Sequence, residues 1–450
     1  MSILVSGLSA ALRRRRRITV LLLMAAGCVS YVDRAALSIS STAVMADMHM
    51  SYTQMGMLLS VFAWAYLAGQ IPMGLLADRF DSRHLLGAGL IVWSCAQMAF
   101  GLMHGVPGLF LARIGLGLGE TPLFLSGTRA LVRWFRPRER GRPIGLFNGS
   151  AALGPAIAPP LLLSIMMLWG WRGMSVAIGA ASLVLAFVWI RFYRDPTDLP
   201  LAAEARDALP GYDAPVAAVT ARALRQDLGY LLRQRSSWIV TAGFAGVIYL
   251  TWLYATWMPA WLQASRHLTI DQAGLLSALP QFCGFAGSVL GGFIADHLAA
   301  RGVTPLNACR TPLVLAMLVA AVATALTTLH TGLAVTIVFM AVALFAGGLA
   351  MSCGWMLGTV IAAEHRVATL QAIQNTGGSF GGALAPAVTG LLADRFGSFT
   401  PSMLVAGAIG LGTVAIYQFG LRPADAAPHA ATPIDHSPRP APGSTGRNKE

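Results

Sequence analysis

The sequence predicts an all-α polytopic membrane protein, in which twelve transmembrane helices form two pseudo-symmetric six-helix bundles. Three observations lead to this fold class. The chain is 56% hydrophobic and only 11% charged, with a mean hydropathy of +0.63, whereas soluble domains carry about 25% charged residues. A membrane-spanning helix needs about 20 mostly apolar residues, and the chain contains twelve apolar runs of this length. The two halves of the chain also repeat one another.

The apolar runs and the polar stretches between them divide the chain. Residues 1–17 form a basic N-terminus, and 194–236 is a polar stretch with several prolines that we expect to be a central cytoplasmic loop. Residues 422–450 are rich in proline and alanine, which predicts a disordered tail. The six-helix bundles are therefore expected at 18–193 and 237–421. The predicted helices are 18–40, 52–77, 84–104, 107–131, 143–167, 172–193, 238–264, 271–298, 308–328, 332–361, 367–393 and 399–421.

The internal repeat supports this division. Gly74-Leu-Leu-Ala-Asp78 recurs as Gly292-Phe-Ile-Ala-Asp296. In the fifth and eleventh helices, five identical residues recur at an offset of 227, beginning with Asn148 and Asn375. Repeats of this kind place a substrate site near mid-membrane, between the halves.

Basic residues predict the orientation, because cytoplasmic loops carry an excess of Lys and Arg. Arg13 to Arg17 precede the first helix, and the expected outer loops hold only Arg172, Arg266 and Arg395. We therefore expect both termini in the cytoplasm and the protein in the inner membrane. This placement accounts for the net charge of +13, so a nucleic-acid partner is not expected. Ala25 to Cys28 imitate a cleavage site, but the apolar run continues past them, which favours an uncleaved first helix.

No residues with the pattern of a catalytic site stand out. The five cysteines are scattered without metal-ligand spacing, which argues against a zinc site or a disulfide framework. Gly115-Leu-Gly-Leu-Gly119 lacks the lysine and the preceding strand of a phosphate loop, and we interpret it as helix packing. We therefore do not expect the protein to be an enzyme or to bind a metal or cofactor. We expect a proton gradient to be its energy source.

Four charged residues in apolar surroundings are the candidate functional centre. Asp33 and Arg34 lie in the first helix, and Arg113 and Glu120 lie on one face of the fourth. A charge at membrane depth costs roughly 2.5–3.5 kcal/mol on insertion scales, so it persists where it is paired or faces a polar cavity. Asp33 and Arg113 are expected at the same depth, which predicts that they pair.

Charge arithmetic suggests proton–anion symport. With Asp33 and Glu120 ionised the four-charge cavity is neutral, and with both protonated it carries +2, ready for an anionic substrate. The alternative is a static ion-pair network that holds the helices together, although small-residue packing would join them at lower cost. The other half offers a polar and aromatic wall, in which Asn375 is the strongest candidate because we expect Gly377 and Gly378 beside it to leave room for a ligand. That wall comprises Tyr249, Trp257, Gln281, Ser352, Trp355, Gln374 and Asn375.

Two sets of motifs carry a resemblance to known families. Gly74-x-x-x-Asp78-Arg79-x-x-x-Arg83 resembles the loop signature of the major facilitator superfamily, with Asp81 and Ser82 departing from it. Tyr31-Val-Asp-Arg34, Arg113-x6-Glu120-x-Pro122 and Trp134-Phe135-x3-Glu139-Arg140-Gly141 resemble the anion:cation symporter family of bacterial sugar-acid and organic-acid transporters, which are related to sialin. The resemblance covers nearly all of 18–421 and implies the major facilitator fold.

The resemblance also implies roles for individual residues. Substrate contacts are implied for Tyr31, Arg34, Tyr66, Trp355 and Asn375. Proton coupling is implied for Asp33, Arg113 and Glu120, and a conformational gate or loop motif for Gly74, Asp78, Arg79, Arg83 and Asp296. Galactonate-type members have a glutamine near Ala151, where this chain reads Asn148-Gly-Ser-Ala-Ala. We therefore include Asn148 among the substrate residues, and a smaller or more apolar acid becomes an alternative.

These observations predict a monomeric, proton-coupled importer of a small organic anion, a sugar acid or related carboxylate, that works by alternating access. Its expected partners are that anion, protons and the lipid bilayer. One alternative is an efflux antiporter of the same fold, which Gly149-x4-Gly154-Pro155 faintly suggests. Another is a membrane sensor that transports nothing.

Overall fold

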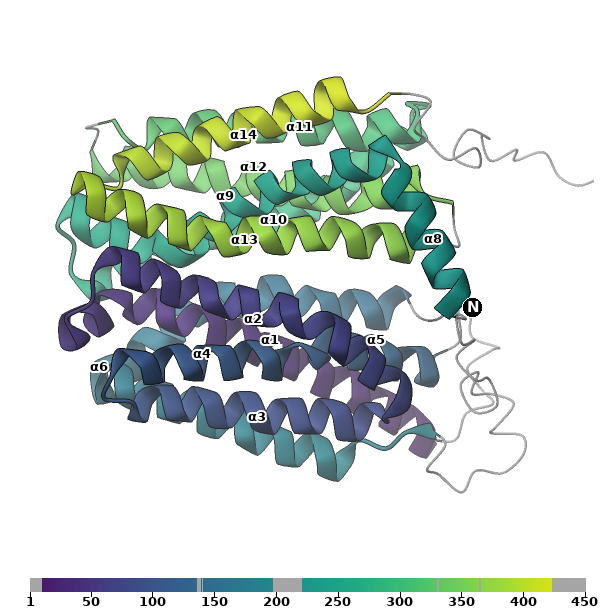
Figure 1. Cartoon of the computed structure of the whole chain (residues 1–450), viewed down its shortest axis with the longest axis horizontal. Helices are drawn as coiled ribbons and strands as arrows, with labels where there is room; N and C mark the ends of the chain where they lie inside the picture. The colour runs from purple at the N-terminus through teal and green to yellow at the C-terminus, as the bar shows by residue number, and fades with distance from the viewer. Residues whose placement is uncertain are drawn as a thin grey trace, which may run out of the picture.

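A computed structural model describes residues 10–135, 139, 141–196, 221–329, 332–363 and 366–422. Helices α1 to α6 lie together in one half of the molecule and α9 to α14 in the other, while α8 lies across the end at which α1 begins (Figure 1). The helices are α1 (Ala10–Met48), α2 (Tyr52–Arg79), α3 (Ser82–Leu102), α4 (Val106–Glu120), α5 (Pro122–Trp134), α6 (Gly141–Phe192), α8 (Ala221–Arg233), α9 (Arg235–Arg266), α10 (Ile270–Ala300), α11 (Pro305–Leu326), α12 (Leu333–Ile361), α13 (Val367–Phe396) and α14 (Thr400–Gly420).

Three of the expected helices are divided differently in the structure: one appears as two elements, and two are joined in one. The span expected at 107–131 comprises α4 and α5, where Pro122 lacks the N–H that would continue the hydrogen-bond ladder. Thr121 between them keeps helical angles, φ −55° and ψ −41°, so the chain continues in the same direction. In contrast, α6 contains two predicted spans that meet at Gly170, whose φ of 66° and ψ of −178° break the helix. A positive φ is readily adopted by glycine.

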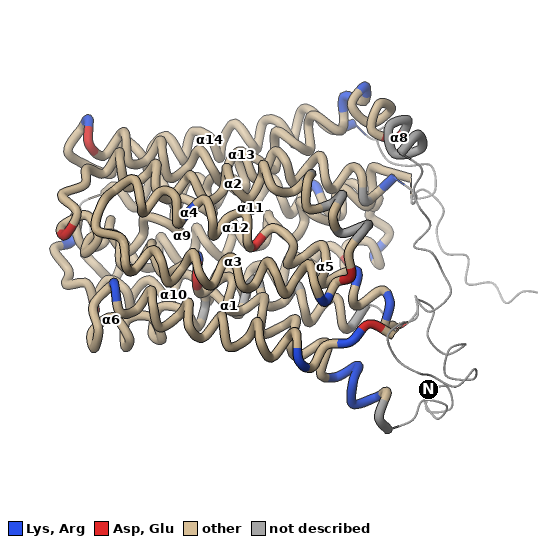
Figure 2. Tube along the Cα trace, turned by 60° about the horizontal axis from the view of Figure 1, so that its bottom comes forward, with Lys and Arg blue, Asp and Glu red and all other residues tan. Residues whose placement is uncertain are grey.

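The surface of the helices suits a lipid environment. Among the described residues, nine helical spans are long and apolar enough to cross a membrane. Lys and Arg gather mainly at the end of the molecule where α1 begins, and few charges lie in its middle (Figure 2). The structure therefore has the character of a multi-pass membrane protein. The first residues, most of the loop at 194–236 and the tail after Arg422 lie outside the described residues, so the predicted domain boundaries there stay predictions.

The two halves meet most closely at one end, which we call the distal end, opposite the start of α1. Ser38 on α1 donates a hydrogen bond to the Thr256 carbonyl oxygen on α9 at 2.9 Å. Thr42 Oγ1 on α1 donates to Gln263 Oε1 on α9, also at 2.9 Å. The backbone N–H groups of Tyr52 and Thr53 donate to the Asp394 carboxylate on α13. The hydrogen bonds in which both partners are described residues, one from α1–α6 and one from α9–α14, all lie at this end.

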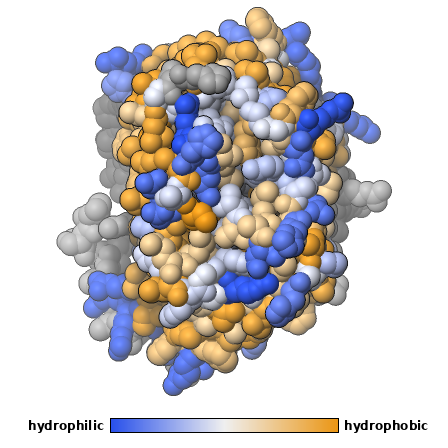
Figure 3. Space-filling view, turned by 90° about the vertical axis from the view of Figure 1, so that its left-hand side faces the viewer, coloured by the Kyte–Doolittle hydropathy of each residue, from blue (hydrophilic) through white to orange (hydrophobic). Residues whose placement is uncertain are grey.

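Figure 3 looks onto the distal end, where hydrophilic residues are spread among hydrophobic ones. Beneath it, the backbones of α2 and α13 approach closely. An added Cβ at Gly56 would lie 2.5 Å from the Pro386 carbonyl oxygen, and one at Gly390 would overlap the Tyr52 carbonyl oxygen. Small residues therefore let these two helices close the distal end.

Candidate functional site

An ion pair between α1 and α4 forms the centre of the candidate site. Arg34 Nε donates to Glu120 Oε2 at 2.8 Å, and Ser30 Oγ donates to the same oxygen at 2.7 Å. Ser30 lies one helical turn before Arg34, so both face α4. The Glu120 side chain is 0% exposed and that of Arg34 is 15% exposed. The pair is thus nearly dehydrated, and removal of either partner would leave an uncompensated buried charge.

Three aromatic rings surround the Arg34 guanidinium. Its central carbon lies 4.8 Å from the ring centroid of Tyr31, 5.0 Å from Phe62 and 5.1 Å from Tyr66. A cation within about 6 Å of a ring face is attracted by the ring quadrupole. These ring contacts leave one donor unused, because Arg34 Nη2 has no hydrogen-bond partner among the described residues. Arg34 therefore keeps a donor for an incoming acceptor.

Arg113 and Asp33 lie next to this pair but do not bond to each other. Arg113 is 4% exposed, and its guanidinium carbon lies 5.0 Å from the Phe62 ring centroid. Asp33 is 0% exposed and its Oδ2 lies 3.2 Å from Ser182 Oγ on α6. The predicted Asp33–Arg113 pair is wrong in this structure, because Glu120 pairs with Arg34 and neither Asp33 nor Arg113 forms a described ion pair.

In the other half, the predicted residues Trp355 on α12 and Asn375 on α13 are both half-buried, and their substrate role stays a prediction. The Trp355 ring packs edge-on against Phe244, with centroids 5.0 Å apart. Gln374 is buried and donates to the Gly354 carbonyl oxygen at 2.8 Å, which is a contact between α13 and α12. The expectation that Gly377 and Gly378 leave room for a ligand is wrong: they pack against α9, and added Cβ atoms would meet the Thr241 carbonyl and the Phe244 ring.

The remaining predicted residues lie away from the charged cluster or have side chains that the structure does not describe. Asn148 belongs to α6, and Gly74, Asp78 and Arg79 belong to the last turns of α2, but the surroundings of these four residues are not described. Asp296 is exposed near the end of α10. The gate role of these loop residues stays a prediction.

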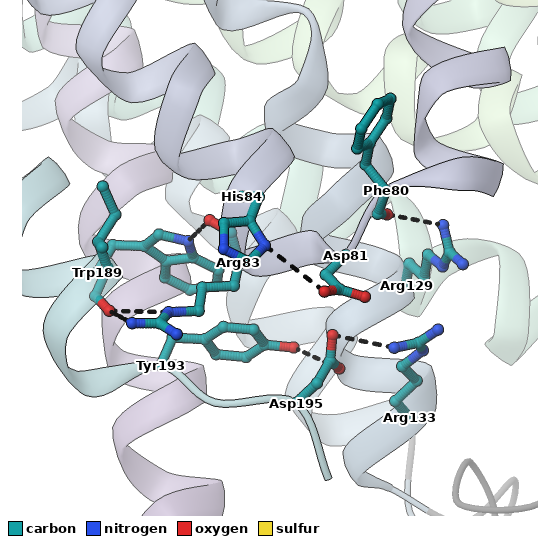
Figure 4. A network of polar contacts seen from close by, with 10 residues as sticks. Phe80, Asp81, Arg83, His84, Arg129, Arg133, Trp189, Tyr193 and Asp195 are labelled. Carbon is teal, nitrogen blue, oxygen red and sulfur yellow. Dashed lines mark hydrogen bonds and ion pairs between the residues drawn. The ribbon is translucent and has the colours of Figure 1, made fainter. Parts of the chain in front are cut away.

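Arg83 belongs to a polar network within the first half, at the end where α1 begins (Figure 4). Its Nη2 and Nε donate to the Ile190 carbonyl oxygen at 2.7 and 2.9 Å, and Trp189 Nε1 donates to the Arg83 carbonyl oxygen at 3.1 Å. Nearby, Asp195 forms an ion pair with Arg133 at 2.9 Å. Burial raises the pKa of the Asp195 carboxyl, although the Arg133 guanidinium opposes the shift. The network ties α3, α5 and the end of α6 together.

Three contributors to the charged site were absent from the sequence analysis: Ser30, Phe62 and Ser182. Ser30 could have been found, because it lies four residues before Arg34 and so shares its helix face. Phe62 is one apolar residue among many in α2. Ser182 is about 150 residues from Asp33 in the chain, and nothing in its surrounding apolar sequence marks it out.

Chemically, the site can bind an anion and hold a proton. It offers a guanidinium donor, tyrosine rings whose hydroxyls suit polyol or carboxylate contacts, and two buried carboxyl groups. Among the described residues, no group of three or more His, Cys, Asp or Glu side chains has the arrangement of a metal site.

The chain is similar in sequence to known transporters. The family model of the Major Facilitator Superfamily matches residues 23–309. The chain is 32% identical to a probable L-galactonate transporter of Escherichia coli strain K12, covering 92% of this chain and 91% of that protein. It is 30% identical to a probable galactarate/D-glucarate transporter, GarP, of the same strain, covering 90% and 94%.

Among solved structures, a bacterial homologue of the human lysosomal transporter Spinster, in an inward-facing and unoccupied conformation, superposes with a TM-score of 0.76. It is 18% identical in sequence, and the match covers 90% of this chain and 97% of that one. This likeness concerns the fold alone and confirms the predicted fold class.

Proposed function

Because this chain belongs to the Major Facilitator Superfamily, we propose that it is a proton-coupled symporter that imports a small organic anion, a sugar acid or related carboxylate, by alternating access. It is a multi-pass membrane transporter rather than an enzyme. The names of the two relatives, an L-galactonate transporter and a galactarate/D-glucarate transporter, support a sugar acid as substrate.

The observation that carries this proposal is the state of Arg34. Its guanidinium is held by Glu120 through Nε and by three rings, while Nη2 remains without a partner. A carboxylate is the natural acceptor for such a planar donor, and charge-assisted hydrogen bonds of this kind are roughly twice as strong as neutral ones. Tyr31 and Tyr66 lie beside it and would contact substrate hydroxyls.

Coupling to protons follows from the two buried carboxyl groups. Glu120 competes with the substrate for Arg34, so protonation of Glu120 would free the guanidinium for the substrate. Asp33 has no cation within ion-pair distance among the described residues and would hold a second exchangeable proton. Protonation of both carboxyls leaves the charges of Arg34 and Arg113 for the anion. An anion and protons would then bind together, which is symport.

Alternating access is supported by where the halves touch. The hydrogen bonds between described residues of the two halves lie at the distal end, so this conformation is closed there. With the N-terminus in the cytoplasm, as the arginines of α1 favour, the closed end faces outward and the site faces the cytoplasm. Opening to the outside then requires that these contacts break.

Asp394 should therefore control the opening of the distal end. Its carboxylate caps the N-terminus of α2 from the opposite half, at 2.9 Å from Tyr52 N and 2.7 Å from Thr53 N. Loss of a helix cap costs about 1 kcal/mol of stability. Asp394→Ala should therefore raise the population of the conformation with an open distal end about fivefold. A cysteine in place of the fully buried Val44, in a background without native cysteines, should then react about fivefold faster with an impermeant maleimide.

Asp271→Ala is the matched control, because Asp271 is an exposed acidic residue at the start of α10, near the same end. It should leave the labelling rate unchanged. An equal rate in the Asp394→Ala variant and the parent would contradict the gating role.

The substrate class is tested by thermal stabilisation of the purified protein with a panel of sugar acids, dicarboxylates, aromatic acids and lipophilic cations. A ligand that binds the folded state alone stabilises it by about 2.7 kcal/mol at one hundred times Kd. We expect sugar acids to raise the melting temperature. Stabilisation by lipophilic cations, with none by any anion, would instead favour an efflux antiporter.

A further inference from the structure

Asp33 is a buried carboxyl group with an unusual set of neighbours. It is 0% exposed, its Oδ1 has no hydrogen-bond partner, and its Oδ2 lies 3.2 Å from Ser182 Oγ. The charged groups that face it are Glu120 and Arg113 on α4 and Arg34 on its own helix. None of them is within ion-pair distance in the described part of the chain. The neighbour from α6 is the Ser182 hydroxyl.

Ser182 cannot donate to all of its neighbours at once. Its Oγ lies 3.2 Å from Asp33 Oδ2 and also 3.0 Å from the Ile178 carbonyl oxygen, one turn earlier on α6. A serine hydroxyl has one proton and two lone pairs. If it donates to Ile178, the contact with Asp33 is satisfied when the carboxylic acid donates to Ser182. If it donates to Asp33, the contact suits an ionised carboxylate.

Ser30 provides a comparison within the same site. Its hydroxyl lies 2.7 Å from Glu120 Oε2, and the same oxygen accepts Arg34 Nε–H at 2.8 Å. These two donors suit an ionised Glu120, and Ser30 forms no second hydrogen bond with a described residue. The two carboxyl groups therefore differ in their serine contacts: Ser30 has one described acceptor, Glu120 Oε2, whereas Ser182 lies within hydrogen-bond distance of two.

We propose that Ser182 is a positioning residue for the proton site, whose hydroxyl turns between the Ile178 carbonyl oxygen and the Asp33 carboxylate as Asp33 gains and loses its proton. This inference rests on the proposed function, in which Asp33 carries an exchangeable proton. In the protonated state, the carboxylic acid donates to Ser182 and Ser182 donates to Ile178. In the ionised state, Ser182 donates to Asp33, and the Ile178 carbonyl keeps its helical hydrogen bond.

The test is an infrared pH titration of the purified wild-type protein, which follows the carboxylic-acid carbonyl band that Asp33→Asn removes. It needs no substrate. Ser182→Ala removes a donor from the ionised carboxylate, and a charge-assisted hydrogen bond is stronger than a neutral one. We therefore expect the midpoint of the band to move to higher pH by about one unit, a tenfold change in proton affinity. Ser182→Thr, which keeps the hydroxyl, should restore the wild-type midpoint.

Ser175→Ala is the matched control. Ser175 is buried on the same helix and donates to the Trp171 carbonyl oxygen at 2.9 Å in the same i to i−4 pattern, but it has no described contact with a carboxyl group. The midpoint of the Asp33 band in the Ser175→Ala variant should equal that of the wild type. This comparison separates a change in the proton affinity of Asp33 from a loss of helix packing. A Ser182→Ala midpoint equal to that of Ser175→Ala would overturn the inference.

Failure of the proposed function has a different signature. If the Asp33 band titrates and shifts as expected but vesicles show no proton-driven uptake of any organic anion, Ser182 still positions Asp33 and the symport proposal fails. If the Asp33 band does not change with pH while the protein stays folded, Asp33 exchanges no proton, and the inference is wrong.

Discussion

Arg34→Ala is expected to abolish the stabilisation by sugar acids and their uptake. The substitution removes the guanidinium that the anion would contact and leaves Glu120, which is 0% exposed, without its ion-pair partner. Breaking a buried pair by removing one partner costs about 3–5 kcal/mol. The variant should therefore melt at a lower temperature even without substrate, and added sugar acid should no longer raise that temperature.

Two further variants separate binding from folding. Arg34→Ala combined with Glu120→Gln removes the uncompensated charge, so it should recover part of the lost stability while binding stays absent. Arg172→Ala breaks the partly exposed ion pair with Asp47 at the distal end and should leave substrate stabilisation intact, because exposed pairs contribute about 0–1 kcal/mol. Substrate stabilisation of normal size in the Arg34→Ala variant would move the binding site away from α1.

Asp33→Asn should abolish uptake against a concentration gradient while substrate exchange continues. Asparagine has a shape similar to that of a protonated aspartate and can keep a hydrogen bond to Ser182, so the substrate should still bind and cross. It has no proton to release, so a pH gradient can no longer drive net accumulation. The measurement compares uptake driven by a pH gradient with counterflow in proteoliposomes preloaded with substrate.

The contrast with Glu120→Gln sharpens this test. Glu120 accepts hydrogen bonds from Arg34 and Ser30, so its amide variant changes the substrate arginine as well as the proton balance. We expect Glu120→Gln to alter counterflow, whereas Asp33→Asn leaves it near the wild-type rate. Full accumulation against a gradient by Asp33→Asn would show that another group couples the proton.

The architecture could be predicted from the sequence because its signals are long and local. A run of about 20 apolar residues is a helix in any membrane protein, and the break at Gly170 falls between the two spans expected at 143–167 and 172–193. The four charged residues of the site were equally visible, since each stands in apolar surroundings. Their importance followed from the cost of burying them.

The choice of partners could not be predicted in the same way. Sequence position gives the depth of a side chain along a helix, so Asp33 and Arg113 were expected to pair. The structure pairs Arg34 with Glu120 instead, because the rotation of α1 about its axis decides which of two adjacent residues faces α4. The rotation of α1 depends on tertiary packing, and α1 packs mainly against α6 and α9.

The role of two glycines in α13 was also predicted wrongly from the sequence. Gly377 and Gly378 suggested space for a ligand beside Asn375, but the same lack of a side chain is used to bring α13 against α9. Glycine in a membrane helix permits close approach of either a ligand or a neighbouring backbone, and the sequence does not distinguish between them. Ser182 carried no signal, because its contact with Asp33 depends on two helices far apart in the chain.

The most direct test of the symport proposal is the movement of protons when substrate flows down its own concentration gradient into sealed vesicles, with no pH gradient imposed. Proteoliposomes in weakly buffered medium receive a sugar acid that stabilises the purified protein, and the external pH is recorded. We predict that the medium becomes more alkaline as substrate enters and that Arg34→Ala abolishes this pH change. Asp33→Asn should still exchange substrate in preloaded vesicles but should leave the external pH unchanged. Substrate entry in the wild type with no change in external pH would contradict proton symport.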